Sequence, residues 1–293
     1  MASRALHIYR LGSTGARRLP EPVVFGVTHL LAGGWMLAAR SPRRQVMRNL
    51  QRARGRSYRG LRLWGATYRT FDSYACYWAE SFRLPVTSPA TLDAGIRVDG
   101  FDHILAGLEA GNGVILALPH MGGWEWAGFW LAEVRGAPVS VVVERLDPAD
   151  LFEWFRHLRQ ALGMNVIPLG AGVGTEVVRA LRDNHVLCLL CDRDLDGGGV
   201  EVEFLGERTT LPAGPATLGL RTGAPILPTA VFFEGRFHRG IVRPPVEADR
   251  RGRLRDDVAR ITQDLARELE TLIREAPDQW HLLQPNWPSD RRQ

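Results

Sequence analysis

From Gly95 onward, apolar and polar residues follow one another in blocks whose lengths predict alternating strands and helices. Short apolar runs of about four to eight residues are typical of buried strands, whereas apolar residues repeating every three or four positions are typical of helices. The predicted strands cover residues 114–118, 138–143, 165–169, 186–191, 226–233 and 238–242. The predicted helices cover residues 124–134, 149–162, 175–182, 213–221 and 256–274.

This order of elements predicts an α/β fold with a mainly parallel central sheet flanked by helices. Parallel neighbours need long crossovers, and helices of this length supply them while covering both faces of the sheet. Ligands of such sheets bind beyond the carboxyl ends of the strands. The residues that follow each strand are therefore the first candidates for function.

The amino-terminal region, residues 1–94, has a different pattern and predicts a helical extension that faces a membrane. Residues 22–39 form the longest apolar run, but 18 residues with His29 and three glycines are marginal for crossing a bilayer. We expect a buried or interfacial helix there. Aromatic residues at helical spacing form a stripe that we expect to pack on the core rather than contact lipid; they are Tyr68, Phe71, Tyr74, Trp78 and Phe82.

Charge is distributed unevenly along the chain. Residues 1–71 contain 14 Arg and one acidic residue, Glu21, whereas the rest contains 23 Arg and 31 acidic residues. Such asymmetry indicates a basic face for a polyanion, although a merely solvated face has the same composition. No nucleic-acid motif is present, so an anionic membrane surface is the expected partner and nucleic acid is not.

The length of 293 residues suits one large α/β domain with a helical extension. We expect residues 1–94 and 95–293 to form one compact unit. The chain has three cysteines, and this small, odd number argues against a disulfide scaffold and fits a reducing cytoplasm. Cys188 and Cys191 lie in an apolar run, so we expect core residues there rather than a redox pair.

A candidate base follows the predicted strand 114–118, in the segment Pro119-His120-Met121-Gly122-Gly123-Trp124-Glu125. The strand places His120 at the active edge, and the two glycines are expected to let the backbone approach a substrate. Glu125, five residues on, is within reach of the imidazole. A carboxylate on one ring nitrogen fixes the tautomer and leaves the other nitrogen to take a proton. A lone histidine after a strand is often structural, so this spacing alone is a weak signal.

Charged residues also follow two other predicted strands, as Glu144-Arg145 and as Asp192-Arg193-Asp194. Such residues are costly to bury unpaired and recur where a ligand binds. Salt bridges between loops explain Glu144 and Asp194 equally well. His120 and Glu125 offer two metal ligands, but no further ligands follow at metal-site spacing, and no metal is predicted.

Several blocks together resemble the bacterial lipid A biosynthesis acyltransferase family, a branch of the lysophospholipid acyltransferase superfamily. The most specific is the His-x4-acid block of His120 and Glu125 with its flanks. Within the family, the chain is most similar to the actinobacterial branch that acylates phosphatidylinositol mannosides. The blocks that carry the resemblance are residues 74–85, 116–125, 144–146, 188–195, 199–207, 211–216 and 280–287.

The resemblance implies roles for individual residues. It implies that His120 is the general base, that Glu125 is its partner, and that Asp192 is a second acid near the histidine. It implies a fatty acyl thioester donor, acyl-CoA in the mannoside branch and acyl carrier protein in parts of the lipid A branch, with no cofactor and no covalent acyl-enzyme. The residues expected to bind substrate are Arg145, Arg159, Arg193, Glu144 and Trp124.

The expected function is therefore transfer of a long-chain fatty acyl group from acyl-CoA to a mannose hydroxyl of phosphatidylinositol mannoside, at the cytoplasmic face of the cell membrane. The protein is expected to be peripheral or shallowly inserted there. One alternative is the same transfer to another glycolipid, such as a lipid A precursor. A second is a non-catalytic membrane-binding protein of this fold, which has no reason to keep a base and its carboxylates. Apolar residues beside the site are expected to divide between an acyl groove and ordinary packing; they are Trp124, Trp126, Phe129 and Trp130.

Overall fold

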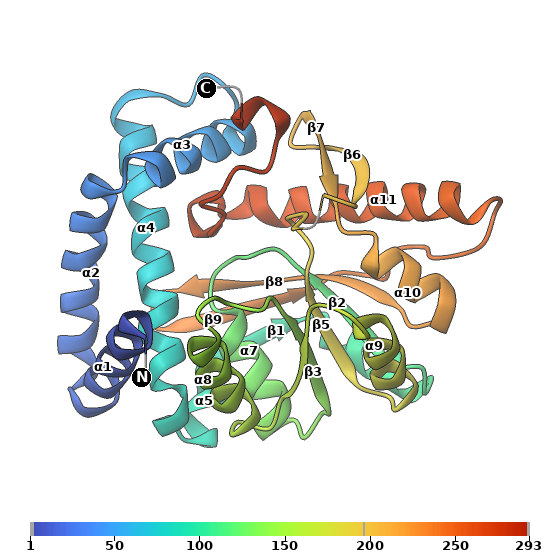
Figure 1. The fold of residues 1–293 in the computed structure, drawn as a ribbon, viewed down its shortest axis with the longest axis horizontal. Helices are drawn as coiled ribbons and strands as arrows, with labels where there is room; N and C mark the ends of the chain where they lie inside the picture. Colours follow the sequence, from blue (N-terminus) through green and yellow to red (C-terminus); the bar gives the residue numbers. More distant parts are fainter. Residues whose placement is uncertain (1–2, 196, 292–293) are drawn as a thin grey trace.

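A seven-stranded sheet runs through the centre of the computed structural model, which describes residues 3–195 and 197–291 (Figure 1). Its strand order is β1-β9-β8-β2-β5-β3-β4. A separate two-stranded hairpin, β6-β7, lies outside it. The strands are β1 Ile96–Asp99, β2 Val114–Leu118, β3 Val139–Val143, β4 Asn165–Pro168, β5 Val186–Leu190, β6 Val200–Phe204, β7 Glu207–Leu211, β8 Ile226–Glu234 and β9 Phe237–Val242.

The sheet is mainly parallel, as the order of elements predicted. β8, β2, β5, β3 and β4 run in one direction, because each link between them passes through a helix. β9 is antiparallel to β8, since the two are joined by a tight turn in which Gly235 has a φ of 65°. β1 pairs parallel to β9 at the edge of the sheet.

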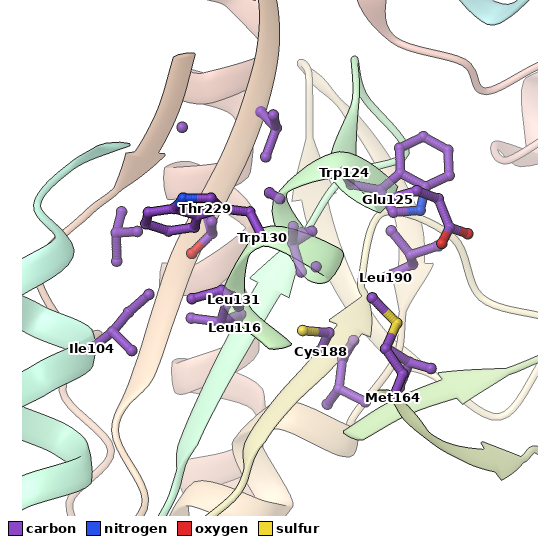
Figure 2. A pocket seen from close by; sticks show the side chains of 18 of the residues that line it. Ile104, Leu116, Trp124, Glu125, Trp130, Leu131, Met164, Cys188, Leu190 and Thr229 are labelled. Carbon is purple, nitrogen blue, oxygen red and sulfur yellow. The ribbon is translucent and has the colours of Figure 1, made fainter. Parts of the chain in front are cut away.

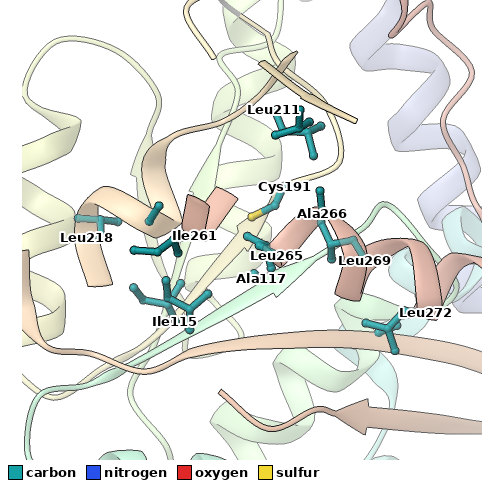
Figure 3. Close-up of a cluster of buried hydrophobic side chains, with 14 of the residues drawn as sticks. Ile115, Ala117, Cys191, Leu211, Leu218, Ile261, Leu265, Ala266, Leu269 and Leu272 are labelled. Atoms are coloured by element: carbon teal, nitrogen blue, oxygen red, sulfur yellow. The ribbon is translucent and has the colours of Figure 1, made fainter. Parts of the chain in front are cut away.

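Helices cover both faces of the sheet, and β2 shows how its side chains divide between them. Ile115 and Ala117 point to the face covered by α9, α10 and α11 (Figure 3), whereas Leu116 and Leu118 point to the face covered by α6 and α7. Both clusters are buried, so the two apolar layers hold the sheet between them. The helices of this part are α5 Pro89–Ala94, α6 Phe101–Glu109, α7 Trp124–Phe129, α8 Ala149–Gln160, α9 Val173–Arg182, α10 Gly214–Thr222 and α11 Leu254–Glu275.

The amino-terminal region forms four helices beside the sheet, at the left of Figure 1. The long helix α4 carries the aromatic stripe. Phe71 is fully buried, while Trp78 and Phe82 pack edge-on or tilted against Tyr9 and one another. The prediction that the stripe packs inside the protein is therefore confirmed. The helices are α1 Arg4–Arg18, α2 Glu21–Ala38, α3 Arg40–Arg54 and α4 Gly60–Arg83.

The outer sides of α1 and α2 expose large apolar side chains, among them Leu11, Leu30 and Leu31. Over residues 3–195 and 197–291, no single helix is long and apolar enough to cross a membrane. α2 and α3 meet that criterion only together, and they are bent by 97° at the break between them.

The structure differs from the predicted elements in several regions. The helix predicted over residues 124–134 is α7 followed by a π-helical turn, η2 (Trp130–Val134). β1 and the β6-β7 hairpin were not predicted. Glu201 and Glu203 of β6 point to solvent between buried neighbours, so this strand lacks a continuous apolar run.

After α11 the chain returns across the sheet edge as an irregular segment, residues 276–290, which we call the carboxyl-terminal strap. It includes the short turns η3 (Pro277–Gln279) and η4 (Pro288–Asp290). Asp290 is buried at its far end, where it accepts hydrogen bonds from Gln45 and Arg52 of α3. The strap thus joins the sheet to the amino-terminal helices.

Candidate active site

His120 and Asp192 meet at the carboxyl edge of the sheet. β2 and β5 pair in parallel with Leu118 opposite Leu190, so the residues two positions beyond each strand lie level with one another. His120 Nδ1 lies 2.6 Å from Asp192 Oδ1, and the His120 backbone N–H donates to Asp192 Oδ2 at 3.0 Å. Parallel pairing therefore builds this contact directly from two strand ends.

Asp192 is completely buried and is held by several donors. Its Oδ2 also accepts from Trp280 Nε1 at 2.7 Å, and its backbone carbonyl accepts from Asn286 Nδ2 at 3.0 Å. Burial raises the pKa of Asp192, but the charge of His120 and the donors around the carboxylate lower this pKa by more, so it lies below its ordinary value. Asp192 is therefore ionised, and His120 Nδ1 is the donor in their hydrogen bond.

The other ring nitrogen of His120, Nε2, is left to accept a proton. The side chain is 27% exposed, so an acceptor molecule can reach it. Trp124 meets the imidazole edge-on, with ring centroids 5.8 Å apart. These contacts fix the ring plane as well as the tautomer, which is what a general base requires.

A second histidine, His281 of the strap, lies beside the pair. Its backbone N–H donates to the His120 carbonyl at 2.7 Å, and its Nε2 lies 2.8 Å from Ser73 Oγ of α4. Nδ1 has no hydrogen-bond partner among the described residues. Burial, followed by the charge of His120, lowers the pKa of His281 to about 3, so His281 is neutral near pH 7.

The expected hydrogen bond between Glu125 and His120 is wrong. Glu125 lies on the first turn of α7 and forms a buried ion pair with Arg159 of α8, whose Nε is 3.1 Å from Oε1. Tyr77 of α4 donates its hydroxyl to the same oxygen at 3.2 Å. The turn after His120 aims Glu125 away from the imidazole, and Asp192 takes the place expected for it.

The Glu125–Arg159 pair is a fixed charge pair under ordinary conditions. Burial lowers the pKa of Arg159, but Glu125 and Tyr77 together raise it by more, so the pKa lies above its ordinary value. Burial and then the charge of Glu125 raise the pKa of Tyr77 well above its usual range. The cluster joins α4, α7 and α8.

The other predicted substrate-binding residues lie around the same edge. Arg193 directly follows Asp192 and donates to Glu144 Oε2 at 2.9 Å. Arg145 is exposed, with its guanidinium 5.8 Å from the ring centre of Phe152. Asp194 accepts from the backbone N–H groups of Gly197 and Gly199, so it shapes its own loop, whereas Glu144 forms the kind of salt bridge between loops that the alternative interpretation expected.

The glycine pair after His120 is required by the packing of its own loop, and the predicted approach of its backbone to a substrate stays a prediction. Gly122 has a φ of 57°, and a Cβ there would lie 1.9 Å from the Val231 carbonyl oxygen of β8. A Cβ on Gly123 would lie 2.5 Å from the His238 ring. The glycines are needed because the loop after β2 lies directly against β8 and β9.

An apolar pocket of about 810 Å³, measured to include its mouth, lies on the α6–α7 face of the sheet (Figure 2). Figure 2 shows Trp124 and Glu125 at one end and Ile104 at the other. Glu125 and Arg159 are its only charged lining residues within the described chain. Because Trp124 also contacts His120, the pocket begins beside the candidate base.

Two of the four aromatic residues considered for an acyl groove line this pocket. Trp124 and Trp130 are lining residues, whereas Trp126 stacks on His238 and Phe129 is buried beside the pocket. Two of the four residues thus line a pocket and two pack inside the protein, whereas contact of the lining residues with an acyl chain stays a prediction.

The two cysteines of β5 and its end are core residues, as predicted, and both are free thiols. Cys188 lines the pocket, where burial raises its thiol pKa to about 12. Cys191 is buried on the opposite face, beside α11, and burial raises its pKa also. Neither thiol has the lowered pKa of a redox cysteine.

Sequence reasoning missed the contributions of Tyr77 and of the strap residues Trp280, His281 and Asn286. The strap residues that contact Asp192 lie 88 and 94 positions beyond it in the sequence, and a local sequence pattern cannot predict contacts at such separations. The one available signal was the tryptophan-rich block 280–287, which stood out only through the resemblance.

A histidine held by a buried carboxylate at the edge of a parallel sheet, beside an apolar pocket, is compatible with acid–base chemistry on an apolar substrate. The family model of bacterial lipid A biosynthesis acyltransferases matches residues 4–289. The chain therefore belongs to this family and is an acyltransferase, and the match includes the amino-terminal helices as well as the sheet.

Similar curated proteins carry a more specific name. A phosphatidylinositol mannoside acyltransferase of Mycolicibacterium smegmatis is 38% identical over 285 residues, which cover 96% of this chain and 91% of the relative. A protein of the same name from Mycobacterium tuberculosis is 43% identical over 226 residues, covering 75% of this chain and 70% of the relative.

Proposed function

We propose that the protein transfers a long-chain fatty acyl group from acyl-CoA to a mannose hydroxyl of phosphatidylinositol mannoside, with His120 as the general base. The observation that carries the proposal is the His120–Asp192 pair at the end of the apolar pocket. The names of the similar mycobacterial proteins support the acceptor.

In the proposed reaction His120 Nε2 takes the proton of the acceptor hydroxyl as its oxygen attacks the thioester carbonyl. A carbon–oxygen bond forms, the carbon–sulfur bond breaks, and the CoA thiolate leaves and receives the proton from His120. Asp192 stabilises the imidazolium between these two steps. No enzyme nucleophile and no cofactor are needed, because the acceptor oxygen itself attacks.

The oxyanion of the tetrahedral intermediate needs hydrogen-bond donors. The Gly122 N–H donates to the Gln279 carbonyl at 3.0 Å, so it is already used. Arg159 is held by Glu125, and Arg193 donates to Glu144 with one of its nitrogens. The candidate donors to the oxyanion are therefore the Gly123 N–H and those guanidinium N–H groups of the arginines at this edge that Glu125 and Glu144 do not accept from.

The pocket supports a long acyl chain in the donor. Its lining is apolar apart from Glu125, Arg159 and Thr229 and includes the sulfur-bearing side chains of Met164 and Cys188, so the hydrophobic effect favours a hydrocarbon chain there. With the thioester carbonyl near Trp124, the chain would extend toward Ile104 (Figure 2). The CoA part then lies outside the pocket, where Arg145 and Arg193 can contact its phosphates.

The proposed place of action is the cytoplasmic face of the cell membrane, with the protein peripheral or shallowly inserted. The exposed apolar side chains of α1 and α2 suit the acyl-headgroup boundary, and the arginines of residues 1–71 suit anionic lipid. Both substrates carry acyl chains, so binding at the lipid surface brings them to the enzyme.

To test the proposal, the purified protein is incubated with palmitoyl-CoA and phosphatidylinositol dimannoside, and acylated product is followed by mass spectrometry. A His120→Ala variant is the control. Product from the wild type and none from the variant supports both acceptor and base. If neither transfer nor thioester hydrolysis depends on His120, the proposed base is wrong and the membrane-binding alternative takes over.

A second candidate acceptor is another glycolipid, such as a lipid A precursor, and the description of the family model favours including it. The same assay with a lipid A precursor separates the two. Thioester hydrolysis that depends on His120, without acylated mannoside, keeps the chemistry and rejects the mannoside acceptor.

A further inference from the structure

The two carboxylate oxygens of Asp192 have separate tasks. Oδ1 lies 2.6 Å from His120 Nδ1, whereas Oδ2 accepts from the His120 backbone N–H at 3.0 Å and from Trp280 Nε1 at 2.7 Å. The terminal torsion of an aspartate is soft, so the carboxylate needs such donors to stop it from rotating. Of the two hydrogen bonds to Oδ2, the one from the Trp280 indole N–H is the shorter.

Trp280 is itself held rigidly. It is 2% exposed and forms an isolated antiparallel bridge with Met121, the residue after His120. Its ring packs edge-on against Phe204, at 6.2 Å and 89°, and against Trp287, at 6.2 Å and 88°. The indole therefore cannot turn away from Asp192 without opening this cluster.

The segments before and after Trp280 are both held by hydrogen bonds near the His120–Asp192 pair. Before it, Gln279 exchanges two hydrogen bonds with the backbone of Phe233 and accepts from the Gly122 N–H. After it, Asn286 donates to the Asp192 carbonyl at 3.0 Å. The donor to Oδ2 thus comes from a scaffold that also holds both strand ends.

We propose that Trp280 is a positioning residue of the acyl transfer, whose indole N–H fixes Asp192 so that Oδ1 faces the imidazole of His120. This inference rests on the proposed function of His120 as the base. Trp280 touches no reacting atom and acts only through Asp192.

Loss of the indole N–H has a specific consequence for the base. With one donor fewer, the charge on Asp192 is less dispersed and the carboxylate becomes a stronger acceptor for the imidazolium. Protonated His120 is then favoured, and protonated His120 cannot take a proton from the acceptor. The acid limb of activity therefore moves to higher pH.

The other ionisable groups around the pair are either buried or held in ion pairs. His281 has a pKa of about 3, and burial raises the pKa of Cys191. Glu125 is paired with Arg159, and Arg193 is paired with Glu144. A change in the acid limb near neutral pH is therefore assignable to His120.

The test is the pH profile of kcat/KM for Trp280→Phe with palmitoyl-CoA and the mannoside acceptor. We expect kcat near pH 7 to fall by about tenfold with KM changed by about twofold or less. The midpoint of the acid limb should rise by about half to one pH unit, the size expected for one hydrogen bond to a charged group.

Trp287→Phe is the matched control. Trp287 is fully buried in the same strap and its Nε1 donates to the Phe204 carbonyl at 3.2 Å, but it does not contact Asp192. Because a phenyl ring at position 287 still packs against Trp280, Trp287→Phe should lower stability by a similar amount and leave the midpoint unchanged. An unchanged midpoint in Trp280→Phe, with an activity loss no larger than that of Trp287→Phe, overturns the proposal.

Site-specific replacement of Trp280 by benzothienylalanine keeps the fused-ring shape and removes only the N–H. If Trp280→Phe does not fold, the same shift should appear in this protein, and its absence rejects the inference. His120→Ala, measured in the same assay, reports separately on the base: activity that survives His120→Ala overturns the proposed function and not merely the role of Trp280.

Discussion

Two buried carboxylates lie within reach of the same edge of the sheet, and they face different partners. Asp192 contacts a histidine that can gain or lose a proton, whereas Glu125 contacts an arginine that keeps its charge. Asp192 is held by backbone and indole N–H donors from the strand ends and the strap. Glu125 is held by side chains of the helical wall, Arg159 and Tyr77.

The comparison shows that burial of an acid near a base does not by itself make it the partner of that base. In the proposed function the His120–Asp192 region moves a proton, and its charges change when it does. The Glu125–Arg159 region is built to close one end of the apolar pocket and to join three helices. Substitutions should therefore affect catalysis in the first region and stability in the second.

The largest expected effect is on catalysis in the first region. Asp192→Asn should lower kcat by about 10³–10⁴-fold, because an amide no longer selects the correct tautomer or stabilises the imidazolium. The measurement is the initial rate of acyl transfer at saturating substrates, with circular dichroism to confirm folding. A loss below about tenfold contradicts the assigned role of Asp192.

In the second region, Arg159→Met should reduce the free energy of unfolding by about 3–5 kcal/mol, because it leaves the charge of Glu125 buried without a partner. The double variant Glu125→Gln with Arg159→Met should recover most of this loss. Denaturant unfolding of the two proteins measures the difference.

The control for this prediction is Arg156→Met on the same helix. Arg156 pairs with the exposed Glu153, so its loss should cost less than about 1 kcal/mol. Equal losses of unfolding free energy in Arg159→Met and Arg156→Met would show that the buried Glu125–Arg159 pair stabilises the fold no more than an exposed ion pair does.

The pH dependence of stability should differ between the regions through His281. Its folded pKa is about 3, below the value of about 6.5 in an unfolded chain. As pH falls below about 6.5, the unfolded state binds a proton that the folded state does not, so stability falls, by at most about 1.4 kcal/mol per pH unit. His281→Gln should show a shallower decline between pH 6.5 and 4. Parallel curves for the two proteins would contradict the buried, neutral state of His281.

The smallest expected effect concerns the pocket that the two regions share. Cys188→Phe adds a ring to the lining of the pocket and should shift the preference toward shorter acyl thioesters by about tenfold. Cys188→Ala removes volume and should leave palmitoyl transfer nearly unchanged. Chain-length competition with mixed acyl-CoA substrates measures both, and an unchanged preference in Cys188→Phe would place the acyl chain elsewhere.

Much of the sheet could be predicted from the sequence because its strands are buried on both faces. β2 lies at the predicted residues, and β5 ends one residue earlier than predicted. The edge strand β1 and the hairpin β6-β7 were missed because alternating exposure gives them no continuous apolar run. A run of apolar residues predicts a strand only when the strand is buried on both faces, and these strands are only half buried.

The site could be predicted only in part. The place of His120 follows from the strand before it, and Asp192 from the strand that pairs with it. The partner of Glu125 depends on the direction of the first turn of α7, which five residues of sequence do not define. Trp280 and His281 depend on the path of the strap, which is set by tertiary contacts over the whole chain.

The most direct test of the central claim is the proton on the His120 ring, observed in nitrogen-15-edited spectra of the wild type, Asp192→Asn and Glu125→Gln. The account predicts a strongly downfield Nδ1 proton in the wild type that persists in Glu125→Gln and is lost or moved upfield in Asp192→Asn. A resonance that survives Asp192→Asn and is lost in Glu125→Gln would contradict the assignment of Asp192 as the partner of the base.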